Sequence, residues 1–146
     1  MKTAAQYSFV LILFILLQMF SRTPKDIDRA LLPYVEAFEK WTDTDTGGRY
    51  YSIKFDLQRP GVAGVAVGMH NNDAVIVRVD PMIWVRLSEA QRSWLVWHEL
   101  AHDLHNSLHG SSFLMARQIP IFLTENMLEV IKGQYLQTLE NGTNKI

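Results

Sequence analysis

Residues 88–105 read SEAQRSWLVWHELAHDLH, and this stretch is the most informative part of the chain about its fold. Ser88, followed three residues later by Gln91, forms a capping box and predicts the start of a helix. The run that follows contains no Gly or Pro and is apolar nearly all round, so we expect a central, buried helix. Asn106 tolerates the left-handed conformation that often ends a helix, which predicts a stop near residues 105–106.

Two histidines of this helix, His98 and His102, are four residues apart. That spacing places both imidazoles on one face, about one turn apart, where they can share one small cation. A catalytic zinc site has three protein ligands and a position left for water, and His109 supplies a third imidazole after the helix ends. Glu99 is rotated by about 100° from His98, beside the metal, where a general base for the attacking water belongs. We therefore expect Zn²⁺ bound by His98, His102 and His109, with Glu99 as the catalytic base.

Two further polar residues of the helix are not expected to bind this metal. His105 lies about 10.5 Å along the helix axis from His98, so one ion cannot be bound by both of them together with His102. We expect His105 to be satisfied by hydrogen bonds or to support a ligand. Asp103 follows a ligand in sequence but points elsewhere on the helix, and we interpret it as a solvated or capping carboxylate.

The histidine motif resembles that of the zincin metallopeptidases, on the metzincin side, in which H-E-x-x-H-x-x-G-x-x-H precedes a methionine turn. This chain has His105 in place of the turn glycine, and its third histidine comes one residue late. It is more similar to small putative metallopeptidases of bacteria and phages, which have H-E-L-G-H and a late histidine. Residues 77–84, VRVDPMIW, and residues 112–115, SFLM, are similar to stretches of those proteins. The resemblance covers about residues 75–116 and implies a zinc peptidase. It also places Met115 beneath the metal, with an ordinary core methionine as the alternative.

The surrounding segments predict an α+β fold, a minimal zincin-like domain with a short, mostly antiparallel sheet packed on the metal-binding helix. The expected elements are a helix over Asp26–Trp41 that Pro33 kinks or divides, a strand over Tyr51–Leu57, a hairpin of Gly61–Met69 and Ala74–Val79, a helix start at Asp80-Pro81, and a closing helix over Thr124–Glu140 stopped by Asn141-Gly142. The first helix should turn Leu31, Tyr34, Val35, Phe38 and Trp41 inward, and the last should bury Met127, Leu128, Ile131, Tyr135 and Leu139.

Composition and charge narrow the class of protein. A chain of 146 residues with 48% hydrophobic and 20% charged residues suits one compact domain, which we place at residues 24–146. The net charge of −1 gives no electrostatic attraction toward nucleic acid. The absence of cysteine excludes disulfides, thiolate chemistry, cysteine-ligated zinc and a lipoprotein-type anchor.

The N-terminal segment bears on location. Residues 9–17, FVLILFILL, form an apolar run behind Lys2, and residues 4–20 extend it to the border between a signal sequence and a spanning helix. Small residues at the usual cleavage spacing are missing, which favours an uncleaved membrane anchor over a cleaved signal; a buried core helix is the remaining alternative. With residues 1–23 as anchor or signal, we expect the protein to be membrane-anchored or exported, with its catalytic domain outside the cytoplasm.

The function predicted from these residues is hydrolysis of a peptide or protein substrate. An extended substrate can pair with an edge strand, zinc can polarise the scissile carbonyl, and Glu99 can take the proton of the attacking water. The candidates for a transition-state donor are His70, Tyr50, Tyr51 and Tyr135. One alternative is a zincin with Glu125 or Glu129 as third ligand. The other is a non-catalytic, membrane-anchored zinc-binding protein; Glu99 argues against it, because a structural site needs no base.

Overall fold

The computed structural model describes residues 25–44, 48–70 and 73–143. The apolar N-terminal helix expected as a signal or anchor lies outside these residues. Within the described ranges, none of the helices combines the length and the apolar character that crossing a membrane requires.

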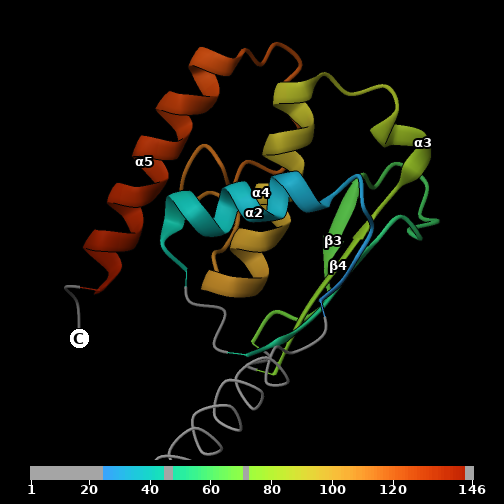
Figure 1. The fold of residues 1–146 in the computed structure, drawn as a ribbon. Coiled ribbons are helices and arrows are strands. Elements are labelled where there is room, and N and C mark those ends of the chain that lie inside the picture. The colour runs from blue at the N-terminus through green and yellow to red at the C-terminus, as the bar shows by residue number, and fades with distance from the viewer. Residues whose placement is uncertain (1–24, 45–47, 71–72, 144–146) are drawn as a thin grey trace, which may run out of the picture.

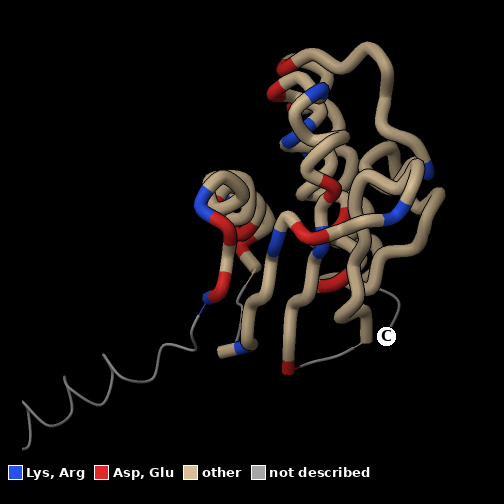
Figure 2. Tube along the Cα trace, turned by 90° about the vertical axis from the view of Figure 1, so that its right-hand side faces the viewer, with Lys and Arg blue, Asp and Glu red and all other residues tan. Residues whose placement is uncertain are grey.

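The described residues form an α+β fold of four strands and four helices (Figure 1). In chain order the elements are β1 (Lys25–Ile27), α2 (Leu32–Thr42), β2 (Tyr50–Lys54), β3 (Gly64–Ala66), β4 (Ala74–Val79), α3 (Pro81–Trp84), α4 (Glu89–His105) and α5 (Glu125–Thr143). Helices α2 and α4 lie between the sheet and α5 (Figure 1). Acidic and basic residues are interspersed along this part of the chain (Figure 2).

The sheet is mixed, with strand order β1-β2-β4-β3. Strand β2 is parallel to both β1 and β4, and only β3 runs antiparallel to β4. The expectation of a mostly antiparallel sheet was therefore wrong, although the β3–β4 hairpin was correct. The cause is connectivity: β1 and β2 are joined through helix α2, and such a crossover returns the chain in the same direction, whereas a short turn reverses it.

Helix α2 begins later than predicted. Residues Lys25–Ile27 pair with β2 as a strand, so the helix starts at Leu32 rather than at Asp26. Pro33 falls in the first helical turn, where a missing N–H costs no hydrogen bond, and it therefore neither kinks nor divides the helix. The predicted apolar face is present: Leu31, Val35 and Phe38 are fully buried, and Tyr34 and Trp41 are partly buried.

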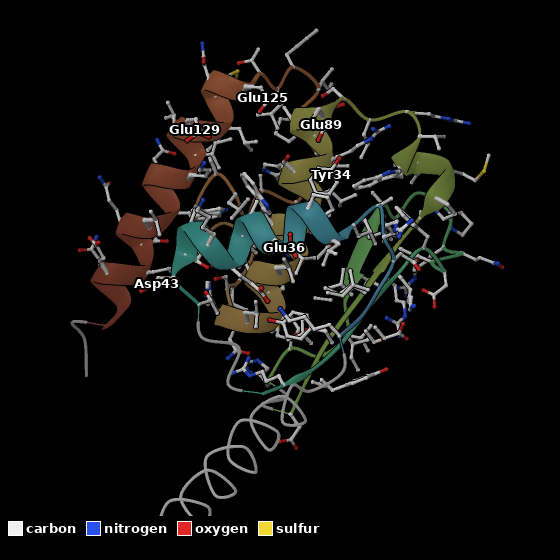
Figure 3. The ribbon with its side chains drawn as sticks, viewed as in Figure 1. Tyr34, Glu36, Asp43, Glu89, Glu125 and Glu129 are labelled. Atoms are coloured by element: carbon white, nitrogen blue, oxygen red, sulfur yellow. The ribbon has the colours of Figure 1, made fainter. Side chains whose placement is uncertain are left out.

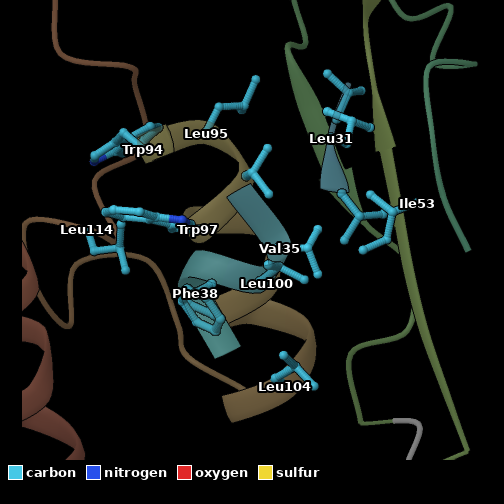
Figure 4. Packing of buried hydrophobic residues seen from close by; sticks show 14 of the residues in the cluster. Leu31, Val35, Phe38, Ile53, Trp94, Leu95, Trp97, Leu100, Leu104 and Leu114 are labelled. Carbon is cyan, nitrogen blue, oxygen red and sulfur yellow. The ribbon is translucent and has the colours of Figure 1, made fainter. Parts of the chain in front are cut away.

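Helix α4 occupies the centre of the molecule, as its sequence predicts. Ser88 and Gln91 form the expected capping box at its start, and Asn106 ends it in the left-handed conformation. One face packs on α2, where Val35 and Phe38 approach Leu100, while Leu31 and Ile53 fill the side toward the sheet (Figure 4). The short helix α3 is capped by Asp80, whose carboxylate accepts hydrogen bonds from the N–H groups of Met82 and Ile83.

Helix α5 closes the domain on the side away from the sheet. Leu128, Ile131 and Tyr135 are buried as predicted, whereas Met127 is 47% exposed, so it does not face the core. The buried residues form a narrow stripe because α5 packs on α4 along one side only. The helix also runs past the predicted stop at Asn141-Gly142 and ends at Thr143.

Asp103 was interpreted as a solvated or capping carboxylate, and the solvated interpretation was wrong. Its side chain is buried, and Oδ2 accepts hydrogen bonds from the N–H of Gly68 (2.9 Å) and of Ile76 (3.0 Å). Burial raises the pKa of this carboxyl, and the two N–H groups counteract the rise. A Cβ at Gly68 would lie 2.4 Å from Oδ2, so the close approach requires glycine. Asp103 therefore fastens the β3–β4 hairpin to α4.

Replacing Asp103 with Ala should lower the free energy of unfolding by about 2–5 kcal/mol, because the buried N–H of Gly68 and the partly buried N–H of Ile76 lose their acceptor. Chemical denaturation followed by tryptophan fluorescence measures this. Asp103→Asn is the matched control: it keeps one acceptor oxygen and should cost less. An alanine variant within about 0.5 kcal/mol of the parent would show that the contact does not hold the hairpin.

Candidate metal centre

Three histidine rings converge where α4 meets the loop that follows it. The Nε2 atom of His102 lies 3.1 Å from Nε2 of His98 and 3.2 Å from Nε2 of His109, and the third side of this triangle measures 3.3 Å. Nitrogen ligands at about 2.0–2.1 Å on a tetrahedral ion lie about 3.3 Å from one another. The triangle therefore has the size of one face of a tetrahedral zinc site, and the three histidines can hold a metal ion.

Hydrogen bonds from the opposite ring nitrogens fix two of these histidines. His98 Nδ1 donates to the carbonyl of Leu114 (2.7 Å), and His102 Nδ1 donates to the carbonyl of Ser107 (2.6 Å). Because a carbonyl can only accept, both protons sit on Nδ1, which leaves the Nε2 lone pairs directed at the common centre. Such carbonyl partners orient metal-binding histidines and select the tautomer that binds.

The loop after α4 carries His109 back toward the helix. Asn106 reverses the chain with φ of 50°, and the N–H of Ser107 bonds the carbonyl of Ala101. Gly110 then adopts φ of 83°, and its N–H bonds the carbonyl of Met115 (2.9 Å). Glycine takes this conformation without the strain that a Cβ imposes. The turn residues therefore accommodate the late position of the third histidine.

Burial keeps His98 and His102 neutral. The pKa of His98 is lowered to about 4, chiefly by burial and in smaller part by the neighbouring His102 and His109, while the hydrogen bond to Leu114 opposes this shift. Burial also lowers the pKa of His102. At neutral pH these rings are therefore unprotonated, which is the form that binds a metal.

Glu99 lies beside this cluster and is not one of its possible ligands. Its side chain is buried and accepts a hydrogen bond from the N–H of Ala66 on β3. Burial raises the pKa of the Glu99 carboxyl to about 7. A Cβ at Gly64 would lie 2.9 Å from Glu99 Oε1, so β3 can pass this close only with a residue that lacks a side chain.

An open cleft of about 700 Å³ contains Glu99 and the three histidines. Residues 61–66, which include β3, form one wall, and residues 117–119 form another. Trp94 and Leu95, both about one turn before His98 on α4, line the same cleft. The cleft therefore extends from the histidines toward the start of α4, and it joins an edge strand to the candidate metal centre.

The other residues singled out from the sequence lie elsewhere. Glu125 and Glu129 project from α5 (Figure 3), both are exposed, and among the described residues neither joins the group of possible metal ligands. His105 is satisfied as expected, with Nδ1 bonded to Tyr135 Oη (2.9 Å) and Nε2 to Thr44 Oγ1 (3.0 Å). Met115 is fully buried, and its position beneath a metal stays a prediction.

None of the proposed transition-state donors lines the cleft among the described residues; these were His70, Tyr50, Tyr51 and Tyr135. Tyr51 belongs to the core, and Tyr135 bonds His105 and Ser107. The cleft instead contains Arg117 and Gln118, which sequence reasoning missed. Their only signal was two adjacent polar residues shortly after the third histidine.

Comparisons of the chain with protein families, with curated proteins and with solved structures find no match. The site must therefore be interpreted from its own geometry. That geometry is a three-histidine cluster of the size of a metal site, a buried carboxyl next to it, and a cleft that gives access to both.

Purified protein should bind about one zinc per chain, and His109→Ala should weaken zinc binding by more than about a hundredfold. The reason is that loss of a ligand should exceed the 10–100-fold cost of losing an outer hydrogen-bond partner. Competition with a chromophoric chelator measures the affinity. His105→Ala and Glu129→Ala are the controls and should leave it nearly unchanged. If Glu129→Ala loses zinc while His109→Ala keeps it, the third ligand is a glutamate of α5 and not His109.

Proposed function

We propose that this protein is a zinc-dependent peptidase in which Glu99 acts as general base. The observation that carries the proposal is the buried Glu99 carboxyl beside three converging imidazoles in one open cleft. A structural zinc site usually closes with a fourth protein ligand and needs no base, whereas a catalytic site has three ligands and an accessible position. Three possible ligands, accessible from a cleft, match the catalytic pattern.

The donor set favours zinc. Three neutral imidazoles without a thiolate or a carboxylate are the ligands of a common type of catalytic zinc site. When bound, zinc supplies Lewis-acid polarisation of the substrate carbonyl and lowers the pKa of the attacking water. His98 and His102 contribute the fixed part of the site, because carbonyl groups hold their rings in place.

Strand β3 offers a place for a peptide substrate. In the pairing of β3 with β4, the backbone groups of Ala63, Val65 and Val67 face β4, so those of Gly64 and Ala66 face the open edge. The N–H of Ala66 is bonded to Glu99, which leaves the N–H of Gly64 as the edge donor for a peptide. An extended peptide can add to this edge as a further strand, a recognised mode of peptide binding. Because the same strand lines the cleft, the added peptide would pass over the three histidines.

Glu99 has the position that a proton-transferring group needs. The N–H of Ala66 and the close packing of Gly64 hold its carboxyl against β3, at the side of the histidine cluster. From there the carboxylate takes the proton of the attacking water and gives it to the leaving amine. The metzincin resemblance and the export or membrane anchoring through residues 1–23 stay predictions from the sequence.

Glu99→Gln should lower peptide hydrolysis by about 10²–10⁴-fold, because an amide cannot accept the proton of water. Zinc content and unfolding midpoint should stay at the parent values, since Glu99 is not a ligand and glutamine has nearly the same shape. The assay follows cleavage of a degenerate hexapeptide library by mass spectrometry. Glu129→Gln, which removes an exposed carboxylate from α5, is the control and should cleave like the parent. Equal cleavage by Glu99→Gln would refute the role of Glu99 as base.

A further inference from the structure

The wall formed by residues 117–119 runs alongside α4. Before it, the carbonyl of Leu114 accepts the hydrogen bond of His98 Nδ1 (2.7 Å). After it, the carbonyl of Pro120 accepts a hydrogen bond from Gln91 Nε2 (2.9 Å). Because Gln91 is in the first turn of α4 and His98 near its middle, the segment between these anchors extends from the histidines back toward the start of the helix. Arg117 lies on this stretch.

Arg117 is an exposed cation in the cleft, and no partner for it is found among the described residues. It is the only Lys or Arg among the described residues that line the cleft, and its guanidinium forms no hydrogen bond or ion pair within the described ranges. Glu99 is the only carboxylate among the described residues of this lining, and the structure has no ion pair between Glu99 and Arg117. Most other lining side chains are apolar, among them Leu95, Ile119 and Ile83. Apart from the proposed metal centre, the guanidinium of Arg117 is therefore the strongest anchor for an anion in the cleft.

The direction of β3 shows which part of a substrate meets Arg117. Gly64 lies against Leu95 and Glu99, and Gly68 lies against Asp103, so the strand runs in the same direction as α4. A peptide added antiparallel, the slightly more stable pairing, would run the opposite way. Its C-terminal part would then lie toward the start of α4, along the stretch of cleft where residues 117–119 form the wall.

We propose that Arg117 binds a carboxylate of the substrate on the C-terminal side of the scissile bond. This inference rests on the proposed peptidase function. The planar guanidinium presents its N–H donors as a rigid fork that fits both oxygens of a carboxylate. The carboxylate is either the free C-terminus of a peptide or the side chain of an Asp or Glu residue. Arg117 thus determines which peptides are bound productively.

The test measures binding in zinc-loaded Glu99→Gln protein, in which turnover of the bound peptides should be slower by at least about a hundredfold. The protein is immobilised and exposed to two N-acetylated degenerate hexapeptide libraries, one with free C-termini and one amidated, and mass spectrometry identifies the retained peptides. We expect about tenfold or greater enrichment of free acids over amides, or of Asp and Glu over Asn and Gln in the amidated library. The first result identifies a C-terminal carboxylate and the second an acidic side chain.

In the Glu99→Gln background, a second change of Arg117→Gln should abolish the enrichment. Arg117→Lys keeps the positive charge but loses the planar guanidinium, so it should restore only part of the enrichment. Arg29→Gln is the matched control, because Arg29 is an exposed arginine that does not line the cleft. Zinc content and circular dichroism should be the same in all variants. Equal retention of carboxylate and neutral peptides, or an enrichment that survives Arg117→Gln, would overturn the inference.

Hydrolysis of the same libraries by the parent chain separates this inference from the proposed function. Cleavage without any carboxylate preference would support the peptidase and refute the role of Arg117. Arg117-dependent retention without cleavage by the parent would refute the peptidase and support the carboxylate site.

Discussion

Helix α4 is buried on nearly every side, yet it carries polar residues in the middle of its sequence. A polar group that leaves water must find a hydrogen-bond partner, or the fold loses about 1–3 kcal/mol for each unpaired group. In this protein the partners are backbone groups of other segments. His98 and His102 bond the carbonyls of the loop after the helix, and Glu99 and Asp103 bond N–H groups of the β3–β4 hairpin. The hydrogen bonds that satisfy the buried polar side chains of α4 therefore also hold the loop and the hairpin of the candidate site against the helix.

These contacts position the two sides of the cleft independently. Asp103 and Glu99 draw β3 close to the helix, and the two glycines at 64 and 68 make that approach sterically possible. On the other side, the bonds of His98 and Gln91 hold the segment that contains Arg117. His98 and Glu99, which belong to the candidate metal centre, thus also help to hold the two walls of the cleft.

The sequence predicted correctly those helix ends that depend on interactions between residues close together in the chain. The capping box at Ser88, the turn residue Asn106 and the Asp80-Pro81 start all rest on interactions within a few residues, and the structure has each of them. The convergence of His98, His102 and His109 followed from helical spacing and one loop. Such features depend on the nearest neighbours in the chain and can be predicted without knowledge of the fold.

The features that were not predicted correctly depend on residues far apart in the sequence. Lys25–Ile27 is too short to carry a strand pattern, and only pairing with β2 makes it one. Parallel pairing of β2 and β4 is set by the path of the chain, and the buried role of Asp103 by a hairpin some thirty residues earlier. Arg117 has no local motif at all; it matters only because the bonds of Leu114 and Pro120 place its segment along the cleft.

The proposed function requires that three histidines and an open position form a catalytic-type zinc centre next to Glu99. X-ray absorption at the zinc edge of the metal-loaded protein tests it most directly. The spectrum should show three imidazole nitrogens at about 2.0–2.1 Å and one light, exchangeable oxygen ligand. A spectrum with fewer than three imidazoles, or with a protein carboxylate in the fourth position, would contradict it.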